Sequence, residues 1–278
     1  MDNSLVSIII PTRNCSYNLK RCLEKIKTQT YPNIEIIIVD GNSTDDTKEI
    51  AKQFTENVFN FEKQGDHRSA QRSLGVNKAQ GVYVLIIDSD MELSENVILR
   101  CVEKMNNDSN IKGLIIPEES FGIGFWAQCK KLEKGFYIGI DWMEAARFFR
   151  KQDFLSVGGY NENMISGEDW DLSRRINNLG QIDRVNDLIY HNEGKISFFK
   201  TIKKKLYYSG KFINYADENR DSALLLKQTS IWQRYKLFFS RPAKLFKNPL
   251  IGVGMLLMKT CELGVGGMGY FFNRIKNT

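Results

Sequence analysis

The sequence is poor in the residues that build disulfide frameworks, structural zinc sites and dithiol redox motifs. Its 278 residues include five cysteines and two histidines, and no two cysteines form a CxxC pair. This usage predicts reduced, mostly buried thiols, as in a cytosolic protein. The N-terminal stretch MDNSLVSIII shows no basic n-region of a secretory signal and leads directly into a predicted strand, so we expect a cytoplasmic location.

Two enzyme classes are disfavoured by motifs that are missing. A dinucleotide-dependent oxidoreductase needs GxGxxG directly after its first strand, and a phosphatase of the haloacid-dehalogenase type needs Asp-x-Asp-Gly-Thr at the same place. Residues 11–14, which follow the first predicted strand, read Pro-Thr-Arg-Asn. They match neither motif, which argues against both classes.

Apolar runs that alternate with amphipathic helical patterns indicate the fold class. Continuous apolar strands are predicted at 5–10, 34–39, 82–87 and 113–117, and helices at 16–29, from Ser43, at 67–79 and from Ser94. Strands that are apolar throughout are typical of a mainly parallel sheet covered by helices on both faces. We therefore expect an α/β fold, in which ligands bind outside the carboxyl ends of the strands.

The stretch YVLIIDSDME, residues 83–92, has two carboxylates directly after a predicted buried strand. At positions i and i+2 of an extended segment, Asp88 and Asp90 would point to the same side. Two unpaired negative charges would repel each other there, and a divalent cation removes the repulsion. Carboxylate oxygens suit Mg²⁺ or Mn²⁺, which also bind phosphate oxygens. The motif indicates a metal that holds a diphosphate; the alternative is a turn with two solvated aspartates.

Other candidate site residues lie near the ends of predicted strands and helices. Asp40 ends a second strand and could accept hydrogen bonds from a base or a ribose. Arg68 and Arg72 lie on one helical face, where they suit a diphosphate or form surface salt bridges. Glu168 and Asp169 open a helix, and a carboxylate there either accepts a proton from an attacking hydroxyl or simply caps the helix.

Six segments in this order resemble the family 2 glycosyltransferases of the GT-A fold. They are SIIIPTRN (7–14), IIIVDGNSTDDT (36–47), the Arg68/Arg72 segment, IIDSD (86–90), VGGYNE (157–162) and GEDWDLSRR (167–175). The resemblance covers about residues 4–195. It implies a Rossmann-like GT-A domain and a metal-dependent, inverting transferase of hexosyl type. The donor would be a nucleotide-diphosphate sugar, a UDP-sugar first and a GDP-sugar next.

The resemblance also implies a role for each matching residue. Asp169 would deprotonate the acceptor hydroxyl, and Glu168 would orient that base or contact the acceptor. The implied donor-binding residues are Pro11, Thr12, Asn14, Asp40, Arg68, Arg72, Asp88 and Ser89. The implied ligands of Mg²⁺ or Mn²⁺ are Asp90, Asp88 and His191. The family's Ala-Arg-Asn reads Gln71-Arg72-Ser73 here, so the asparagine contact is missing.

The C-terminal part of the chain differs from the rest in charge. Residues 195–278 carry 16 Lys and Arg against 4 Asp and Glu, whereas residues 1–194 carry 23 against 29. Aromatic residues are interleaved with the basic ones, as in FFKTIKKKLYY (198–208). This mixture suits a membrane surface or a nucleic acid better than plain solvent. We predict a catalytic domain at 1–195 and a helical, membrane-associating region at 196–278.

The apolar segment 249–272 is interrupted by Lys259 and Glu262. Its longest uncharged run is shorter than the roughly 20 apolar residues that span a bilayer. We therefore expect peripheral binding at the cytoplasmic face of the cell membrane, beside a polyprenol-linked or cell-surface glycan acceptor. The alternative is a helix that packs on the catalytic domain. Arg147 and Trp170 are candidate acceptor contacts.

A non-catalytic protein that binds sugar nucleotides, or a membrane scaffold, is the competing functional class. The Glu168–Asp169 pair argues against it, because a binding protein needs no proton acceptor. We expect no nucleic acid partner.

Overall fold

The chain folds as two compact units in the computed structural model, which describes residues 3–63, 67–220 and 222–276. The first unit comprises Met1–Pro117, Ala145–Asn163 and Glu168–Asn192, and the second comprises Glu118–Glu144, Met164–Gly167 and Glu193–Thr278. The chain leaves the first unit and returns to it twice before residues 193–278 complete the second unit. The predicted division at residue 195 into a catalytic and a membrane-associating domain stays a prediction.

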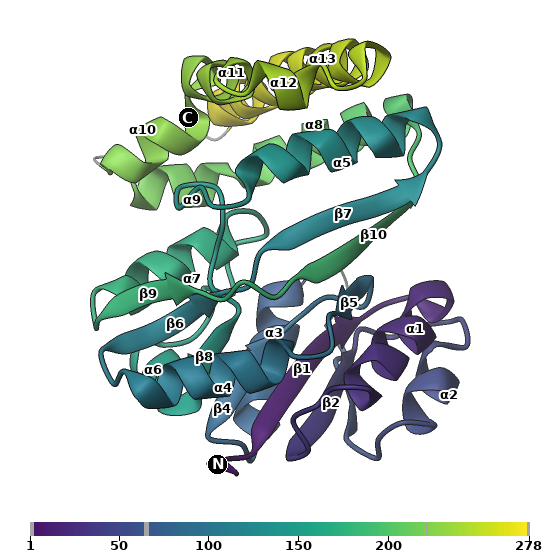
Figure 1. The fold of residues 1–278 in the computed structure, drawn as a ribbon, viewed down its shortest axis with the longest axis vertical. Helices are drawn as coiled ribbons and strands as arrows, with labels where there is room; N and C mark the ends of the chain where they lie inside the picture. The colour runs from purple at the N-terminus through teal and green to yellow at the C-terminus, as the bar shows by residue number, and fades with distance from the viewer. Residues whose placement is uncertain (1–2, 64–66, 221, 277–278) are drawn as a thin grey trace. The chain divides into compact units, whose positions relative to one another are not determined.

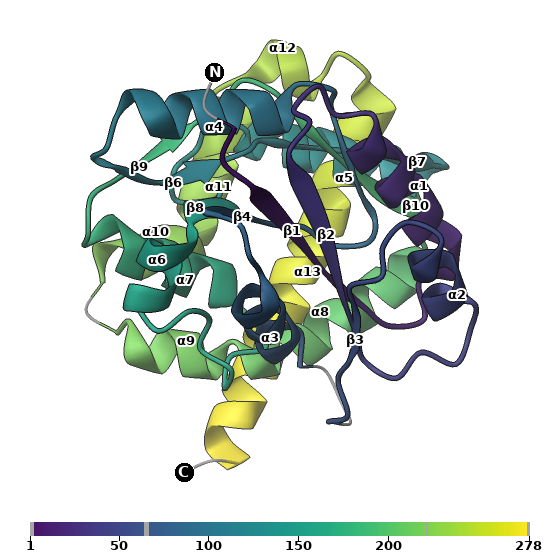
Figure 2. The ribbon, with the colours of Figure 1, turned by 90° about the horizontal axis from the view of Figure 1, so that it is seen from below.

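The first unit is built on a seven-stranded sheet (Figures 1 and 2). Its elements are β1 (Val6–Thr12), α1 (Ser16–Lys27), β2 (Ile34–Asp40), α2 (Thr47–Lys52), β3 (Val58–Asn60), α3 (Arg68–Lys78), β4 (Tyr83–Ile86), β5 (Met91–Leu93), α4 (Val97–Asn107), β6 (Ile111–Ile115), β8 (Phe148–Arg150), α6 (Lys151–Ser156), α7 (Glu168–Asn177) and β9 (Gln181–Arg184). The strand order is β3-β2-β1-β4-β8-β6-β9, and only β8 runs antiparallel to its neighbours. The predicted mainly parallel α/β fold is confirmed.

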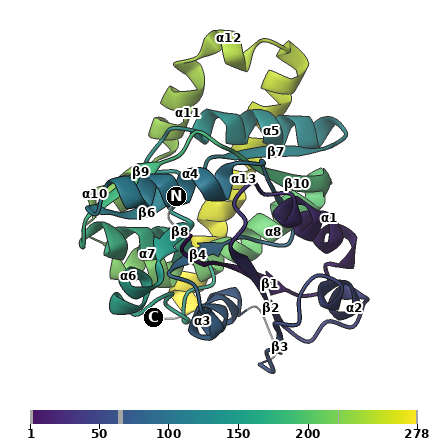
Figure 3. The ribbon, with the colours of Figure 1, turned by 60° about the horizontal axis from the view of Figure 1, so that its bottom comes forward.

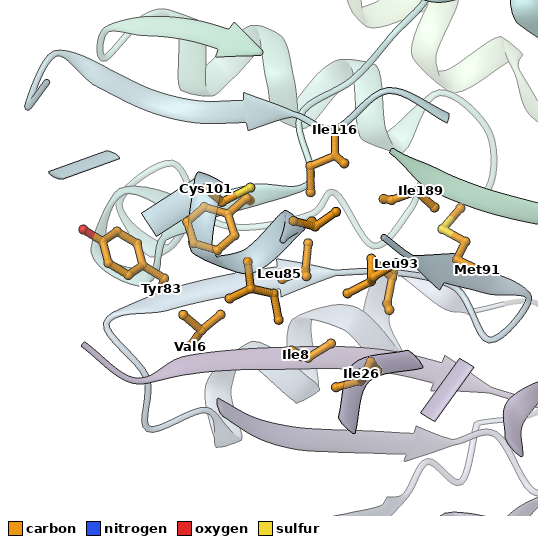
Figure 4. Close-up of a cluster of buried hydrophobic side chains, with 14 of the residues drawn as sticks. Val6, Ile8, Ile26, Tyr83, Leu85, Met91, Leu93, Cys101, Ile116 and Ile189 are labelled. Carbon is orange, nitrogen blue, oxygen red and sulfur yellow. The ribbon is translucent and has the colours of Figure 1, made fainter. Parts of the chain in front are cut away.

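Side chains alternate across the strands and build a core on each face of the sheet. On one face, Ile8 belongs to a buried cluster with Ile26 of α1 and Cys101 of α4 (Figure 4). On the other face, its neighbour Ile9 belongs to a cluster with Val76 of α3. Helices therefore cover both faces, which explains why the strands are apolar throughout rather than alternating.

One glycine sets how closely α3 approaches the sheet. A Cβ atom on Gly75 would lie 2.5 Å from Ile9 Cγ2, which no side chain could tolerate. Glycine therefore lets α3 lie against β1 and brings Gln71 and Arg72, one turn earlier, to the carboxyl end of the strands. Packing at this glycine positions polar residues of the candidate site.

Two predicted helix starts are wrong. The helix expected to begin at Ser43 begins at Thr47, because Ser43 Oγ instead accepts the N–H of Asn14 at 2.9 Å. The helix expected from Ser94 begins at Val97, and Ser94 Oγ accepts the N–H of Leu188 at 3.2 Å. In both cases a contact with another segment replaces the helix cap that local sequence favours.

The second unit consists of β7 (Glu118–Ile123) and helices. The helices are α5 (Phe125–Tyr137), α8 (Phe198–Lys211), α9 (Ile213–Glu218), α10 (Ala223–Thr229), α11 (Ile231–Phe239), α12 (Pro242–Leu245) and α13 (Pro249–Lys276). The strand β10 (Ile189–Lys195) begins in the first unit and ends in this one, and its neighbours are β5 and β7. Figure 3 shows the long α13, which packs against α5 and α8.

Four charged side chains of α5 and α13 form what we call the balanced cluster. It consists of Lys130, Glu133, Lys259 and Glu262. Lys259 Nζ lies 2.6 Å from Glu133 Oε1 and 3.1 Å from Glu262 Oε2, and Lys130 Nζ lies 2.7 Å from both glutamates. Two positive and two negative charges thus neutralise each other inside the unit. The charges that interrupt the apolar C-terminal segment are turned inward.

Among the described residues, α13 alone has the length and apolar composition of a membrane-crossing helix. The stretch Pro249–Ile275 contains 27 residues with a mean hydropathy of 1.4, and 39% of its most apolar window is buried. The five cysteines are free thiols, three of them buried, as their spacing predicted.

Candidate active site

The loops that follow β1 and β2 are tied to each other by hydrogen bonds. The N–H of Asn14 donates to Ser43 Oγ at 2.9 Å, and Asn14 Oδ1 accepts the N–H of Thr44 at 2.8 Å. Asn14 has a left-handed backbone, with φ of 49°, which asparagine adopts more readily than most residues. Pro11 is buried and Asn14 is exposed. The hydrogen bonds of Asn14 therefore fix the conformation of the loop where a nucleoside pocket is predicted.

Asp40 is fully buried, with an exposed fraction of 0%, and holds the same two loops together. Its Oδ1 accepts the hydroxyl of Thr12 at 2.9 Å, its Oδ2 accepts the N–H of Ser43 at 2.8 Å, and Lys48 Nζ lies 3.5 Å from Oδ2. Direct contact with a base would require some of these bonds to be replaced. The geometry therefore favours a role in shaping the pocket, and the base contact stays a prediction.

The two aspartates that follow β4 have different partners. Residues 88–91 form a turn in which the N–H of Met91 donates to the carbonyl of Asp88 at 3.1 Å. Asp88 Oδ1 lies 2.7 Å from Arg72 Nη2, whereas Asp90 Oδ2 lies 3.3 Å from His191 Nε2. The segment turns instead of staying extended as predicted, so strand alternation does not set the directions of the two carboxylates.

Asp90 and His191 lie together because β10 pairs antiparallel with β5, with His191 opposite Met91. Asp90 Oδ1 is buried and accepts no hydrogen bond from the described residues. In those parts of the chain, no three His, Cys, Asp or Glu side chains are grouped to hold a metal. The pair therefore fits a cation that takes most of its ligands from a diphosphate and water, as Mg²⁺ commonly does.

Arg72 is 1% exposed and joins three carboxylates in what we call the acidic cluster. Its Nη2 lies 2.7 Å from Asp88 Oδ1, and its Nη1 lies 3.1 Å from Asp169 Oδ1 and 3.3 Å from Glu168 Oε1. One guanidinium thus contacts three carboxylates directly, and further arginine charges also act on Asp88 and Glu168. Arg72 would have to give up Asp88 to meet a diphosphate as predicted, and that contact stays a prediction.

Two carboxyl groups of the acidic cluster, those of Asp88 and Glu168, have pKa values pushed in opposite directions. Burial raises the pKa of Asp88, but Arg72 and then Arg147 outweigh it and hold that pKa well below its ordinary value. Burial and then Asp169 raise the pKa of Glu168 to about 7, against the opposing effect of Arg72. An ionised carboxylate thus lies near a carboxyl that titrates around neutral pH, a separation typical of acid–base sites.

The remaining predicted site residues lie around this cluster or nearby. Arg68 is the half-buried first residue of α3, and its charge acts on both Asp88 and Glu168. Ser89 hydrogen-bonds the thiol of Cys15. The candidate acceptor contacts are Arg147, which is buried directly before β8, and Trp170, which is half-buried in the first turn of α7.

Two buried polar side chains that sequence reasoning missed complete the candidate site. Gln71 Nε2 donates to the carbonyls of Thr12 at 3.1 Å and Val39 at 2.8 Å, and so bridges β1 and β2. The Tyr160 hydroxyl donates to Asp169 Oδ1 at 2.9 Å. The only signal for Gln71 in the sequence is that it replaces the alanine of the family's Ala-Arg-Asn pattern. The signal for Tyr160 is the glycine pair before it, which predicts a sharp turn.

Comparison with known proteins identifies the family. The model of "Glycosyl transferase family 2" matches residues 7–161. The chain is 26% identical to the GalNAc(5)-diNAcBac-PP-undecaprenol beta-1,3-glucosyltransferase of Campylobacter jejuni, over 98% of this chain and 84% of that protein. The match to two other curated glycosyltransferases is partial and spans 15% of the length of one and 33% of the length of the other.

Solved structures share the fold at low sequence identity. A mannosyltransferase from Pyrobaculum calidifontis in complex with GDP-Man and Mn²⁺ superposes with a TM-score of 0.66 at 14% identity, over 97% of this chain and 88% of that one. TarS 1–349 of S. aureus in complex with UDP gives a TM-score of 0.54 at 12% identity, over 98% of this chain and 92% of that one. The fold is GT-A, as predicted, and the chain belongs to glycosyl transferase family 2.

Proposed function

We propose that the chain is an inverting glycosyltransferase that moves a sugar from a nucleotide-diphosphate sugar to an acceptor hydroxyl. The observation that carries this proposal is the acidic cluster, in which Arg72 ties Asp88 after β4 to Glu168 and Asp169 at the start of α7. One guanidinium therefore contacts both the carboxylate proposed to bind the donor and the two carboxylates proposed to act on the acceptor. Family membership supports sugar transfer as the reaction.

Asp169 is the proposed general base. Its side chain is 26% exposed, so one side of the carboxylate can meet an acceptor hydroxyl while the other is held from within. The acceptor oxygen attacks C1 of the sugar as the C1–O bond to the diphosphate breaks. The hydroxyl proton passes to Asp169, and the electron pair of the broken bond leaves with the nucleoside diphosphate. Glu168 orients the base or contacts the acceptor, and Arg147 and Trp170 are the proposed acceptor contacts.

The donor pocket is proposed at the carboxyl ends of β1, β2 and β4. Its residues are Pro11, Thr12, Asn14, Asp40, Arg68, Arg72, Asp88 and Ser89. Structural neighbours with GDP-Man and with UDP support a nucleotide donor without choosing between bases. We keep a UDP-sugar as the first candidate and a GDP-sugar as the second.

Mg²⁺ or Mn²⁺ is the proposed cofactor. Asp90 and His191 would hold it, with Asp88 from the same turn, and the buried Asp90 Oδ1 that accepts no hydrogen bond from the described residues supports this assignment. When bound, the metal neutralises charge that develops on the departing diphosphate. The Mn²⁺ in the mannosyltransferase neighbour supports the same proposal.

The C-terminal region, residues 196–278, is proposed to bind an anionic membrane at the cytoplasmic face. One face of α13 carries apolar side chains that are each more than half exposed, namely Leu250, Val253, Leu257, Met268, Phe271, Phe272 and Ile275. Leu250, Val253 and Leu257, and likewise Met268, Phe271 and Ile275, recur every three or four residues, so they form one stripe along the helix with a gap of eleven positions between Leu257 and Met268. The charges at Lys259 and Glu262 are taken up by the balanced cluster, so they do not interrupt this stripe.

This arrangement favours a helix that lies in the membrane interface over one that spans the bilayer. Lys259 Nζ is bonded to Glu133 of α5 at 2.6 Å, and a spanning α13 would have to break that contact. Exposed apolar side chains elsewhere in the unit, such as Phe199 and Trp232, would enter the same interface beside basic residues that attract anionic lipid. The undecaprenol-linked substrate in the name of the Campylobacter relative supports a lipid-linked glycan acceptor.

Product analysis tests the proposed reaction. The full chain with Mg²⁺ or Mn²⁺ is screened by thermal shift against UDP- and GDP-sugars, and the stabilising donor is incubated with lipid-linked glycan acceptors. Proton NMR of the product should show an anomeric configuration opposite to that of the donor. Donor binding without transfer or hydrolysis would leave a binding protein, and a retained configuration would contradict the inverting mechanism.

Flotation with liposomes tests the membrane proposal. The full chain should float with vesicles containing phosphatidylglycerol, and the double variant L250S/F271S should float about tenfold less because two exposed apolar side chains are lost. The matched control is Tyr17→Ser, which removes an exposed aromatic side chain of α1 in the first unit. Equal flotation of all three proteins, or none by the wild type at low salt, would contradict the proposal.

A further inference from the structure

Tyr160 is a buried tyrosine of the first unit that the mechanism above does not use. It is 3% exposed, and its ring meets that of Phe154 edge-on, with centroids 5.7 Å apart. The preceding Gly158 and Gly159 have positive φ values of 81° and 65°, a conformation that favours glycine. This turn directs the Tyr160 side chain inward.

The hydroxyl of Tyr160 and the guanidinium of Arg72 converge on one oxygen of the proposed base. Tyr160 donates to Asp169 Oδ1 at 2.9 Å, and Arg72 Nη1 donates to the same oxygen at 3.1 Å. The guanidinium carbon also lies 5.3 Å from the centre of the tyrosine ring. Among the described residues, none donates to the other oxygen, Asp169 Oδ2.

We propose that Tyr160 is a positioning residue for proton transfer: with Arg72 it fixes Oδ1 of Asp169, so that Oδ2 is presented to the acceptor hydroxyl. This inference rests on the proposed role of Asp169 as the base. The terminal torsion of an aspartate is broad, so donors are needed to hold the carboxylate plane. A small misplacement of a reacting group lowers the reaction rate strongly. Two donors on the buried side hold the carboxylate in place and leave its reactive oxygen, Oδ2, open to the acceptor.

A structural tyrosine would behave differently from a positioning one. Loss of a buried hydrogen bond lowers stability whatever its place in the fold. Loss of positioning lowers kcat and leaves the Michaelis constants for donor and acceptor nearly unchanged, because the bond matters when the proton moves. The two roles are separated by kinetics on a variant that keeps the aromatic ring.

The test is Tyr160→Phe in two backgrounds. In the wild-type background, kcat should fall about 5- to 10-fold with both KM values within about twofold. In the Asp169→Asn background, the same change should have at most about a twofold effect, because no base remains to be positioned. Single-turnover assays with excess enzyme and radiolabelled donor make the slow rates measurable.

Tyr83→Phe is the matched control. Tyr83 is also 3% exposed and also donates its hydroxyl to a side chain, Asn106 Oδ1, but on β4 it lies in a different core cluster. This variant should lose stability without losing kcat. The positioning role is refuted, and the base assignment is kept, if D169N is strongly slowed while Y160F has wild-type kcat or shows an equal loss in both backgrounds. An active D169N would instead overturn the base assignment itself.

Discussion

The two units of the molecule each bury a cluster of charged side chains, and the clusters differ in balance. The balanced cluster of the second unit pairs two lysines with two glutamates. The acidic cluster of the first unit pairs one arginine with three carboxylates. A neutral buried cluster specifies which helices pack together. In the acidic cluster three carboxylates share one direct partner while further arginines act on them from nearby, so their pKa values are pushed apart.

The pKa values of two buried glutamates, one in each cluster, show this difference. Burial raises the pKa of both, but Lys130 and Lys259 outweigh it at Glu133 and hold that pKa well below its ordinary value. At Glu168 burial is reinforced by Asp169, and the pKa rises to about 7. The same residue type therefore stays ionised in one cluster and titrates near neutral pH in the other.

Removal of the proposed metal ligand should have the largest effect. Asp90→Ala should reduce turnover to background, since the charge on the departing diphosphate would then lack its partner. EDTA should do the same to the wild type, and added Mn²⁺ should restore only the wild type. Initial rates of transfer measure the effect, with Asp183→Ala, a carboxylate paired to Lys104, as the control. Full activity of D90A would overturn the metal assignment.

Breaking the balanced cluster should cost stability and not chemistry. Lys259→Met leaves two buried glutamates with one lysine and should lower the free energy of unfolding by about 3 kcal/mol or more. The double variant K259M/E262M restores the balance and should recover most of that loss. Urea unfolding curves of the three proteins check this. If K259M and K259M/E262M were equally stable, charge balance within the balanced cluster would not determine stability.

Glu168 should make stability depend on pH, with an effect of up to about 3 kcal/mol from its raised pKa. The folded chain binds this proton more tightly than the unfolded chain, so the contribution is favourable at pH 4.5 and is lost as pH rises to about 7. Glutamine does not titrate, so the free energy of unfolding of Glu168→Gln should lack this decrease. The variant should therefore become more stable relative to the wild type as pH rises from 4.5 to about 7. Urea unfolding from pH 5 to 8 measures this dependence, with the exposed Glu24→Gln as control. If the stability of Glu168→Gln changed with pH in parallel with that of the wild type, the raised pKa of Glu168 would be refuted.

Much of the fold could be predicted from the sequence because both faces of the sheet are buried. Continuous apolar strands such as residues 34–39 follow directly from that burial, and the rule that ligands bind at strand ends brought Asp40, Asp88 and Asp90 into consideration. Helix starts were less predictable: Ser43 has the side chain of a helix cap, yet its Oγ accepts the N–H of the distant Asn14.

The inner arrangement of the site could not be predicted, because it depends on contacts between distant residues. Arg72 meets Glu168 and Asp169 across 96 and 97 residues of chain, and no local pattern reveals such a contact. The pairing of β10 with β5 brings His191 to Asp90 in the same way. The sequence named these residues as site candidates, and the resemblance grouped Asp90 with His191, but the direct contacts between the side chains follow only from the fold.

The measurement that tests the central claim most directly is sugar transfer by Asp169→Asn. At saturating donor and acceptor its rate should fall by about 10²- to 10⁴-fold if Asp169 is the general base, while calorimetry should show donor affinity within about threefold of the wild type. Asp171→Asn is the matched control, because Asp171 lies in the same turn of α7 and pairs with Arg174 and Arg175, and this variant should keep near-normal kcat. A D169N variant that transfers sugar at close to the wild-type rate would contradict the account.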